Sequence, residues 1–249
     1  MSSSCTRNVW AVCKRELGGY FTSPVAYVFI IIFLVLAGFF TFNVGAFFAR
    51  GEASLGAFLI WHPWLYLFLV PAVGMRLWAE ERKAGTLELL LTMPLTTWQA
   101  ILGKFLAAWL VLALALALTF PIVITVCTLG DPDQGVMACG YLGSLLLAGA
   151  YLAVSSMTSA MSRNQVVSFI LSVVICLFLL LAGWPPVTGM LVNWAPAWLV
   201  DGVAACSVMP WFDDLQKGVV DSRGLLYFLS LILFALFTTG IILRGRKTN

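Results

Sequence analysis

The chain has 249 residues, of which 61% are hydrophobic and only 10% charged, and its mean hydropathy is +0.99. A soluble domain carries about 25% charged residues, so this composition excludes a soluble enzyme and a disordered chain and indicates a membrane protein. The net charge of +3 gives no sign of a nucleic-acid-binding surface.

Six stretches without Asp, Glu, Lys or Arg are long enough to cross a bilayer. They contain 20 to 37 residues and occupy 17–49, 53–75, 105–130, 134–162, 164–200 and 224–243. A spanning helix needs about 20 apolar residues, and continuous rather than alternating apolar runs exclude a β-barrel. We therefore predict an all-α polytopic membrane protein with six transmembrane helices, at about 24–48, 58–78, 98–128, 137–161, 166–183 and 224–243.

The basic residues predict the orientation of these spans. With six spans both termini lie on one side, and that side carries most of the 14 basic residues. Only Arg50, Lys217 and Arg223 fall on the opposite side. Because basic loops stay in the cytoplasm, we expect both termini to be cytoplasmic and the protein to lie in a bacterial inner membrane.

Residues 6–21 precede the first span and predict an amphipathic helix. The apolar positions at helical spacing are Val9, Trp10, Cys13, Leu17, Tyr20 and Phe21, and the charged face carries Arg7, Lys14, Arg15 and Glu16. Such a helix lies in the membrane interface. It either anchors the first span or contacts a partner, and the first apolar run is too long for a cleaved signal peptide.

The segment 79–97 between the second and third spans is the most informative loop. Glu80, Glu81, Arg82 and Lys83 form a cluster of mixed sign, and Gly85 permits a sharp break. Thr86 can then cap a short helix that ends at Pro94. An ordinary topology-fixing loop is the alternative, but glutamates contribute little to orientation, which slightly favours protein docking.

Segments further along the chain suggest packing rather than chemistry. Glycines and serines at helical spacing in the fourth span indicate close helix contacts or the lining of a translocation path. His62 is expected at a membrane boundary as an interfacial side chain rather than as a ligand or proton relay. Residues 184–223 predict short external re-entrant or interfacial helices between the last two spans, with acidic residues on a solvated rim.

Motifs of catalysis and nucleotide binding are absent from the sequence. Gly103-Lys104 is followed by Phe105 and has no preceding P-loop glycine, and the single histidine excludes an HExxH metal site. No ionisable side chain is expected deep in a span, which argues against a proton-coupled carrier. The prediction is a chain with no catalytic residues, no metal and no cofactor of its own.

The loop then identifies a family. Residues 78–94, Trp-Ala-Glu-Glu-Arg-Lys-Ala-Gly-Thr-Leu-Glu-Leu-Leu-Leu-Thr-Met-Pro, resemble the E-E-(R/K)-x-x-G-T-x-E-x-L-x-x-x-P segment of ABC-2 type permeases. Further stretches, including Trp61-His-Pro-Trp64 and Leu129-Gly-Asp131-Pro-Asp133, look most like the gliding-motility-associated permeases of that family.

The resemblance implies that residues 1–249 form a single ABC-2 type transmembrane domain, the permease half of a transporter. A separate ATPase subunit would bind ATP and Mg. The implied ATPase-coupling residues are Glu80, Glu81, Arg82, Gly85, Thr86 and Glu88, with further contacts from Lys14, Arg15 and Glu16. The second half would be a distinct, larger permease or a copy of this chain.

Two other functions remain open at this stage. The chain could be a non-transporting membrane subunit of an ATP-driven envelope or motility complex. A stand-alone channel or membrane enzyme is disfavoured by the missing catalytic and intramembrane polar residues.

Overall fold

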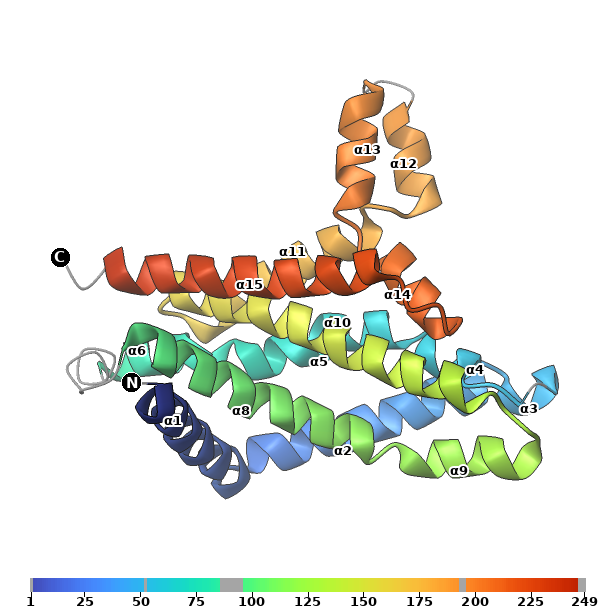
Figure 1. The fold of residues 1–249 in the computed structure, drawn as a ribbon, viewed down its shortest axis with the longest axis horizontal. Helices are drawn as coiled ribbons and strands as arrows, with labels where there is room; N and C mark the ends of the chain where they lie inside the picture. The colour runs from blue at the N-terminus through green and yellow to red at the C-terminus, as the bar shows by residue number, and fades with distance from the viewer. Residues whose placement is uncertain (1, 52, 86–95, 193–195, 246–249) are drawn as a thin grey trace.

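The computed structural model describes residues 2–51, 53–85, 96–192 and 196–245, and the secondary structure in these ranges is entirely helical. The helices form an elongated bundle in which both chain termini lie at the same end (Figure 1). We call this end, where α1, α6 and the start of α8 also lie, the terminal end. Coupling residues Thr86 and Glu88 lie outside the described residues.

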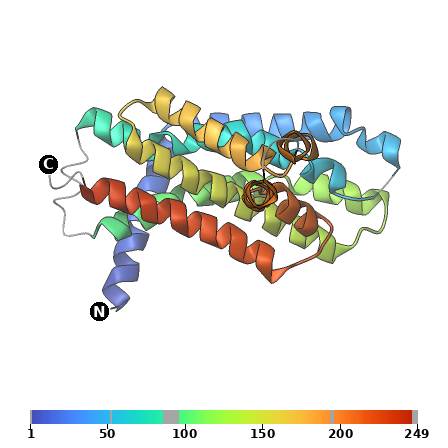
Figure 2. The same ribbon diagram turned by 90° about the horizontal axis from the view of Figure 1, so that it is seen from above.

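The first part of the chain forms α1 (Ser2–Thr22), α2 (Pro24–Phe39), the π-helical turn η1 (Phe40–Val44) and α3 (Phe47–Arg50). Pro24 begins α2, where the missing N–H has no helical partner to lose. Helix α1 is tilted against the bundle and lies across the terminal end (Figure 2).

The second predicted span, 58–78, is divided among α4 (Gly56–Leu59), α5 (His62–Gly74) and α6 (Arg76–Ala84). Pro63 stands in the first turn of α5, and Pro71 inside it removes one backbone donor. The joint at Met75 therefore separates an apolar helix from the amphipathic, charged helix α6.

The remaining helices complete the bundle. They are α8 (Thr97–Ala117), α9 (Phe120–Leu129), α10 (Gln134–Met161), α11 (Gln165–Leu181), α12 (Pro185–Val192), α13 (Ala197–Ala205), α14 (Met209–Gln216) and α15 (Ser222–Gly245). Side-chain caps mark the starts of three of them: Thr96 and Gln99 form a capping box at α8, Asp133 caps α10, and Asn164 caps α11.

Helix α10 is the central helix and packs against α5, α6, α8, α11, α14 and α15. Its small residues permit these contacts. A Cβ atom added to Gly140 would lie 2.3 Å from Leu59 Cδ1, and one added to Gly149 would lie 3.0 Å from Trp109 Nε1. Ser144 bonds to Tyr66 at 2.7 Å. The small residues of the fourth span are therefore packing positions, as one of the two interpretations predicted.

Four helical segments of the described chain are long and apolar enough to cross a membrane: Ala26–Ala49, Thr97–Leu129, Gln134–Met161 and Ser222–Gly245. The apolar helix α11 has 17 residues and α5 has 13, below the length of a continuous span. The structure thus supports four of the six predicted spans by length.

His62 differs from its predicted interfacial position. Its side chain is fully enclosed, with ring centroids 4.4 Å from Phe58, 5.2 Å from Tyr66 and 6.0 Å from Phe33. Because α2 packs against α5 at this level, the imidazole is covered by aromatic rings of its own chain rather than by lipid headgroups.

In the segment predicted to be external, α12 and α13 form a hairpin that projects sideways from the bundle (Figure 1). Its exposed side chains include Met190 and Trp198, and Asp201 is exposed on α13. The short helices predicted here are present.

Candidate functional site

The joint between α5 and α6 is held by a serine from the central helix. The Ser159 hydroxyl donates to the Met75 carbonyl at 2.8 Å and accepts from the backbone N–H groups of Trp78 and Ala79, each at 3.0 Å. A helix start leaves its first N–H groups without intrahelical partners. One buried side chain of α10 thus satisfies both sides of the joint.

Two further bonds fix α6 to the end of α10. The Trp78 indole N–H donates to the Ser156 hydroxyl at 3.0 Å, and the Arg82 guanidinium donates to the Ala160 carbonyl at 2.7 Å. Trp78 is among the largest fully buried side chains of the protein. Helix α6 therefore starts from a fixed direction on the bundle.

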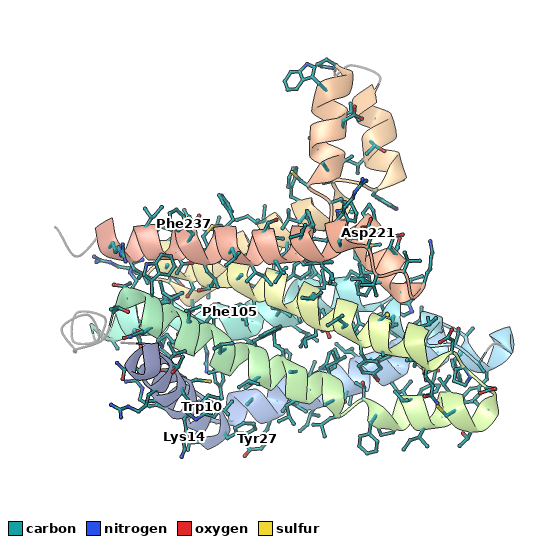
Figure 3. The ribbon with its side chains drawn as sticks, in the orientation of Figure 1. Trp10, Lys14, Tyr27, Phe105, Asp221 and Phe237 are labelled. Atoms are coloured by element: carbon teal, nitrogen blue, oxygen red, sulfur yellow. The ribbon has the colours of Figure 1, made fainter. Side chains whose placement is uncertain are left out.

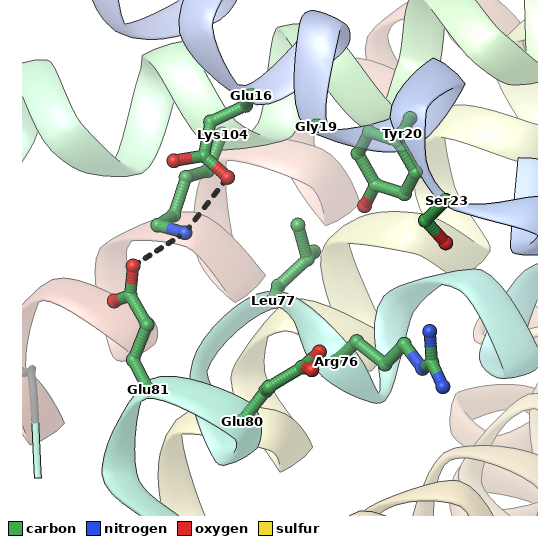
Figure 4. Close-up of a pocket in the computed structure, with 9 residues that line it drawn as sticks. All are labelled: Glu16, Gly19, Tyr20, Ser23, Arg76, Leu77, Glu80, Glu81 and Lys104. Carbon is green, nitrogen blue, oxygen red and sulfur yellow. Dashed lines mark hydrogen bonds and ion pairs between the residues drawn. The ribbon is translucent and has the colours of Figure 1, made fainter. Parts of the chain in front are cut away.

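Lys104 of α8 joins three helices at the terminal end. Its ammonium lies 3.1 Å from Glu16 Oε2 of α1 and 2.9 Å from Glu81 Oε1 of α6, as Figure 4 shows. The same nitrogen lies 5.5 Å from the centroid of the Trp78 ring. Lys104 is only 4% exposed, so water screens these interactions weakly. We call Lys104, Glu16 and Glu81 the lysine clamp.

Close packing of α1 on α8 brings Glu16 to this lysine. A Cβ atom added to Gly103 would lie 2.7 Å from Val12 Cβ and 3.0 Å from the Val9 carbonyl oxygen, so only glycine permits this approach. Val12 and Cys13 are buried against the bundle, whereas Trp10 is 62% exposed. The sequence had placed Glu16 on the outward charged face of α1, and the structure instead turns it inward.

The lysine clamp lowers the pKa of Glu16. Burial raises the pKa of this carboxyl, but the Lys104 ammonium and the Arg15 guanidinium outweigh that effect and lower its pKa below the ordinary value of 4.5. Arg15 Nη2 lies 2.7 Å from Glu16 Oε1. The carboxylate is thus held in its charged form.

A cavity of about 270 Å³ adjoins the clamp. Its lining comes from α1, α6, α8 and the α1–α2 turn: Glu16, Gly19, Tyr20, Ser23, Arg76, Leu77, Glu80, Glu81 and Lys104 (Figure 4). With Lys104 already bound to two of the three carboxylates, Glu80 is exposed for other contacts.

The predicted coupling residues therefore divide into two groups. Glu81 pairs with Lys104, and Arg82 donates to the Ala160 carbonyl, so both side chains are bound within the protein. Gly85, with φ +72°, ends α6 and donates its N–H to the Glu81 carbonyl. Glu80, Lys14 and Arg15 are exposed, and so is the neighbouring Lys83, which was not among the predicted coupling residues. The outward charges of the terminal end thus come from a smaller set than the sequence indicated.

Sequence reasoning missed two residues of this site. Lys104 was counted as the boundary of a charge-free window, although it lies inside an apolar helix, which is itself a signal of a buried partner. Ser159 was one of several small residues in α10 with nothing to distinguish it. Among the described residues, no cluster of His, Cys, Asp and Glu could hold a metal ion.

Comparison with known proteins agrees with the loop motif. The pattern of the family described as ABC-2 family transporter protein matches residues 68–197, more than half of the chain. The chain belongs to the ABC-2 family of transporter permeases. This match covers α6, most of the central bundle and the start of the external segment.

Two curated relatives are both described as a probable ABC transporter permease protein, NosY. The one from Pseudomonas aeruginosa is 29% identical over 168 residues, which are 63% of this chain and 61% of the relative. The one from Stutzerimonas stutzeri is 33% identical over 117 residues, or 45% and 42% of the two chains. The chain thus covers less than two thirds of either relative's length.

Membership in the ABC-2 family makes the chain a multi-pass membrane protein of a transporter permease family. The similarity to gliding-motility-associated permeases remains a prediction from sequence.

Proposed function

We propose that this chain is the permease subunit of an ATP-driven transporter in a bacterial inner membrane, and that its ATPase docks at the terminal end. The ATPase would carry ATP and Mg. A second permease half, either a copy of this chain or a distinct permease, would complete the pathway. The proposal rests on the family match and on the lysine clamp.

The clamp is the observation that carries the coupling role. It connects α1, α6 and α8 through one buried ammonium, so a push on α6 moves all three helices together. Packed elements of this kind move as rigid bodies rather than deforming continuously. Glu80, Lys83 and the residues up to Pro94 would offer the ATPase its contact surface, and the exposed Lys14 of α1 would add a further contact.

The charge distribution supports a cytoplasmic position for this end. Arg76, Arg82, Lys83, Arg163 and Arg244 belong to helix ends and turns at the terminal end, where both termini lie. Basic residues favour the cytoplasmic side. We further propose that α5, continued to Trp78 at the start of α6, and α11 also cross the bilayer, because both pack against α10. This arrangement gives six spans.

A charge-reversal experiment tests the docking role. The double variant Glu80→Lys, Lys83→Glu reverses two exposed charges of α6 while leaving the lysine clamp intact. Because rim charges control association and register, we expect about a tenfold weaker association with the cognate ATPase, equal to about 1.4 kcal/mol. The variant Asp201→Lys, at the far hairpin, is the matched control.

Copurification and ATPase activity in proteoliposomes are the two readouts. If the double variant binds and stimulates the ATPase as the unmodified chain does, the docking assignment is wrong. If the unmodified chain stimulates the ATPase but no solute moves when ATP is hydrolysed, the alternative of a non-transporting membrane subunit is favoured instead.

A further inference from the structure

The lipid-facing side of the bundle contains a second cavity, between α8 and α15. It measures about 450 Å³ and is lined only by Trp98, Leu102, Leu233, Phe234, Leu236 and Phe237. Phe237, labelled in Figure 3, lies on α15 and is 55% exposed. We call this cavity the α8–α15 groove.

A close contact between Gly240 of α15 and Trp98 of α8 forms the groove without an occupant. A Cβ atom added to Gly240 would lie 2.9 Å from Trp98 Cη2, so the glycine lets the indole lie flat against α15. Trp98 and Phe237 stack with ring centroids 6.0 Å apart and an interplanar angle of 22°. The two aromatic rings therefore keep their positions without an occupant.

A cation marks the terminal end of the groove. The Arg244 guanidinium carbon lies 5.6 Å from the centroid of the Trp98 ring, and Arg244 is exposed. Within the described part of the chain, the ion pairs are those of Glu16 with Arg15 and Lys104 and of Glu81 with Lys104. Arg244 thus lies over the Trp98 ring, and no carboxylate among the described residues forms an ion pair with it.

The spacing along α15 matches the shape of a phospholipid. Leu233 and Phe237 precede Arg244 by 11 and 7 residues, which places them about 10–17 Å deeper along the helix. A basic residue at the end of a span attracts anionic headgroups, and Trp98 stands at the level between charge and apolar groove, where indoles favour the interface.

We propose that the α8–α15 groove binds one anionic phospholipid. Its phosphate contacts Arg244, its glycerol region lies over Trp98, and one acyl chain lies along Leu102, Leu233 and Phe237. Acyl chains gain little by leaving lipid for an equally apolar groove. Selectivity therefore comes from the phosphate, and a single basic residue gives a preference of about fivefold for anionic over zwitterionic lipid.

Native mass spectrometry of the detergent-solubilised chain tests this. Phosphatidylglycerol and phosphatidylcholine are added at equal concentration, and the first bound lipid is counted. We expect about a fivefold preference for phosphatidylglycerol, its loss in Arg244→Gln, and weaker retention of both lipids in Leu102→Trp, which fills the groove.

Matched controls are Arg163→Gln, a neutralised exposed arginine at the same end, and Val174→Trp, an enlarged exposed side chain on α11. Both should bind lipid as the unmodified chain does. Equal loss of preference in Arg163→Gln, or an unchanged preference in Arg244→Gln, would overturn the proposal.

A second copy of the chain is the competing occupant. In membranes containing the single-cysteine variant Phe237→Cys, efficient disulfide crosslinking between two copies would show that protein covers the groove and would also overturn the proposal. Absence of this crosslink, together with the expected lipid preference, supports it. Because the groove lies on α8 and α15, these outcomes are independent of ATPase docking at α6.

Discussion

At the residue scale, Lys104 is the most consequential side chain of the terminal end. An ammonium buried to this degree is stable only when its charge is paired. Glu16 and Glu81 provide that pairing from two different helices, and the Trp78 ring adds a cation–π contact. Removing the lysine takes away the ammonium that the Glu16 and Glu81 carboxylates share.

We expect Lys104→Met to destabilise the protein by about 1–3 kcal/mol, below the value for fully buried pairs because both carboxylates are partly exposed. The measurement is the thermal unfolding midpoint in detergent. Lys104→Met combined with Glu81→Gln should recover part of the loss, since the repulsion between the Glu16 and Glu81 carboxylates is removed. If the double variant is no more stable than the single variant, the clamp is not what holds these helices.

Glu16 gives this clamp a pH dependence. Its pKa is lowered in the folded state, so the stabilisation is fully present above the unfolded value and is lost as the pH falls through the lowered pKa. We expect the unfolding midpoint of the unmodified chain to fall on acidification below the ordinary carboxyl pKa of 4.5. Glu16→Gln should flatten this decline, and equal slopes for the two proteins would contradict the assignment.

At the element scale, α6 depends on the end of α10. Ser159 supplies one donor and one shared acceptor at the α5–α6 joint, where Pro71 has already removed a donor from the preceding helix. Helix α6 is thereby attached to the central helix of the bundle. Under the proposed function, a movement of α6 would pass through this attachment to α10.

We expect Ser159→Ala to cost about 1–3 kcal/mol, because it leaves buried backbone groups without partners. Ser230→Ala is the control: that hydroxyl is exposed and bonds only to the Tyr227 carbonyl of its own helix. Hydrogen exchange should show faster opening of 76–84 in Ser159→Ala alone. Unchanged exchange there would show that the joint is held by other contacts.

At the scale of the whole molecule, the bundle has a polar, charged terminal end and apolar sides. Large apolar side chains are exposed along α2, α11 and α15, including Ile31, Val35, Ile170, Val174 and Leu233. On a soluble protein such a surface would aggregate, whereas in a bilayer it contacts lipid or the second permease half. The hairpin of α12 and α13 leaves the bundle from one of these sides.

The proposed orientation predicts a labelling pattern. In a cysteine-free background, Asp201→Cys should react with a membrane-impermeant maleimide in intact spheroplasts, because α13 would lie outside. Lys83→Cys on α6 should react only after lysis. Labelling of position 83 in intact spheroplasts would show that the orientation is opposite to the proposed one.

The sequence by itself determined that this is a membrane protein, which family it belongs to and where most helices lie. These follow from the length of the apolar runs, the placement of the charges and one local motif. It predicted α1, α10 and α15 closely. It did not predict the division of 58–78 into three helices. The joint at Met75 is held by a hydrogen bond from Ser159, which is distant in the sequence.

Only the tertiary structure decided which charges of the site face inward. Glu16 and Lys104 are 88 residues apart in the chain, and helical spacing assigned Glu16 to an outer face. The close approach of α1 to α8 at Gly103 reverses that assignment, because pairing between helices depends on how their backbones pack and not on the periodicity of either one. The same reason explains why the α8–α15 groove, formed where Gly240 meets Trp98, has no signature in the sequence.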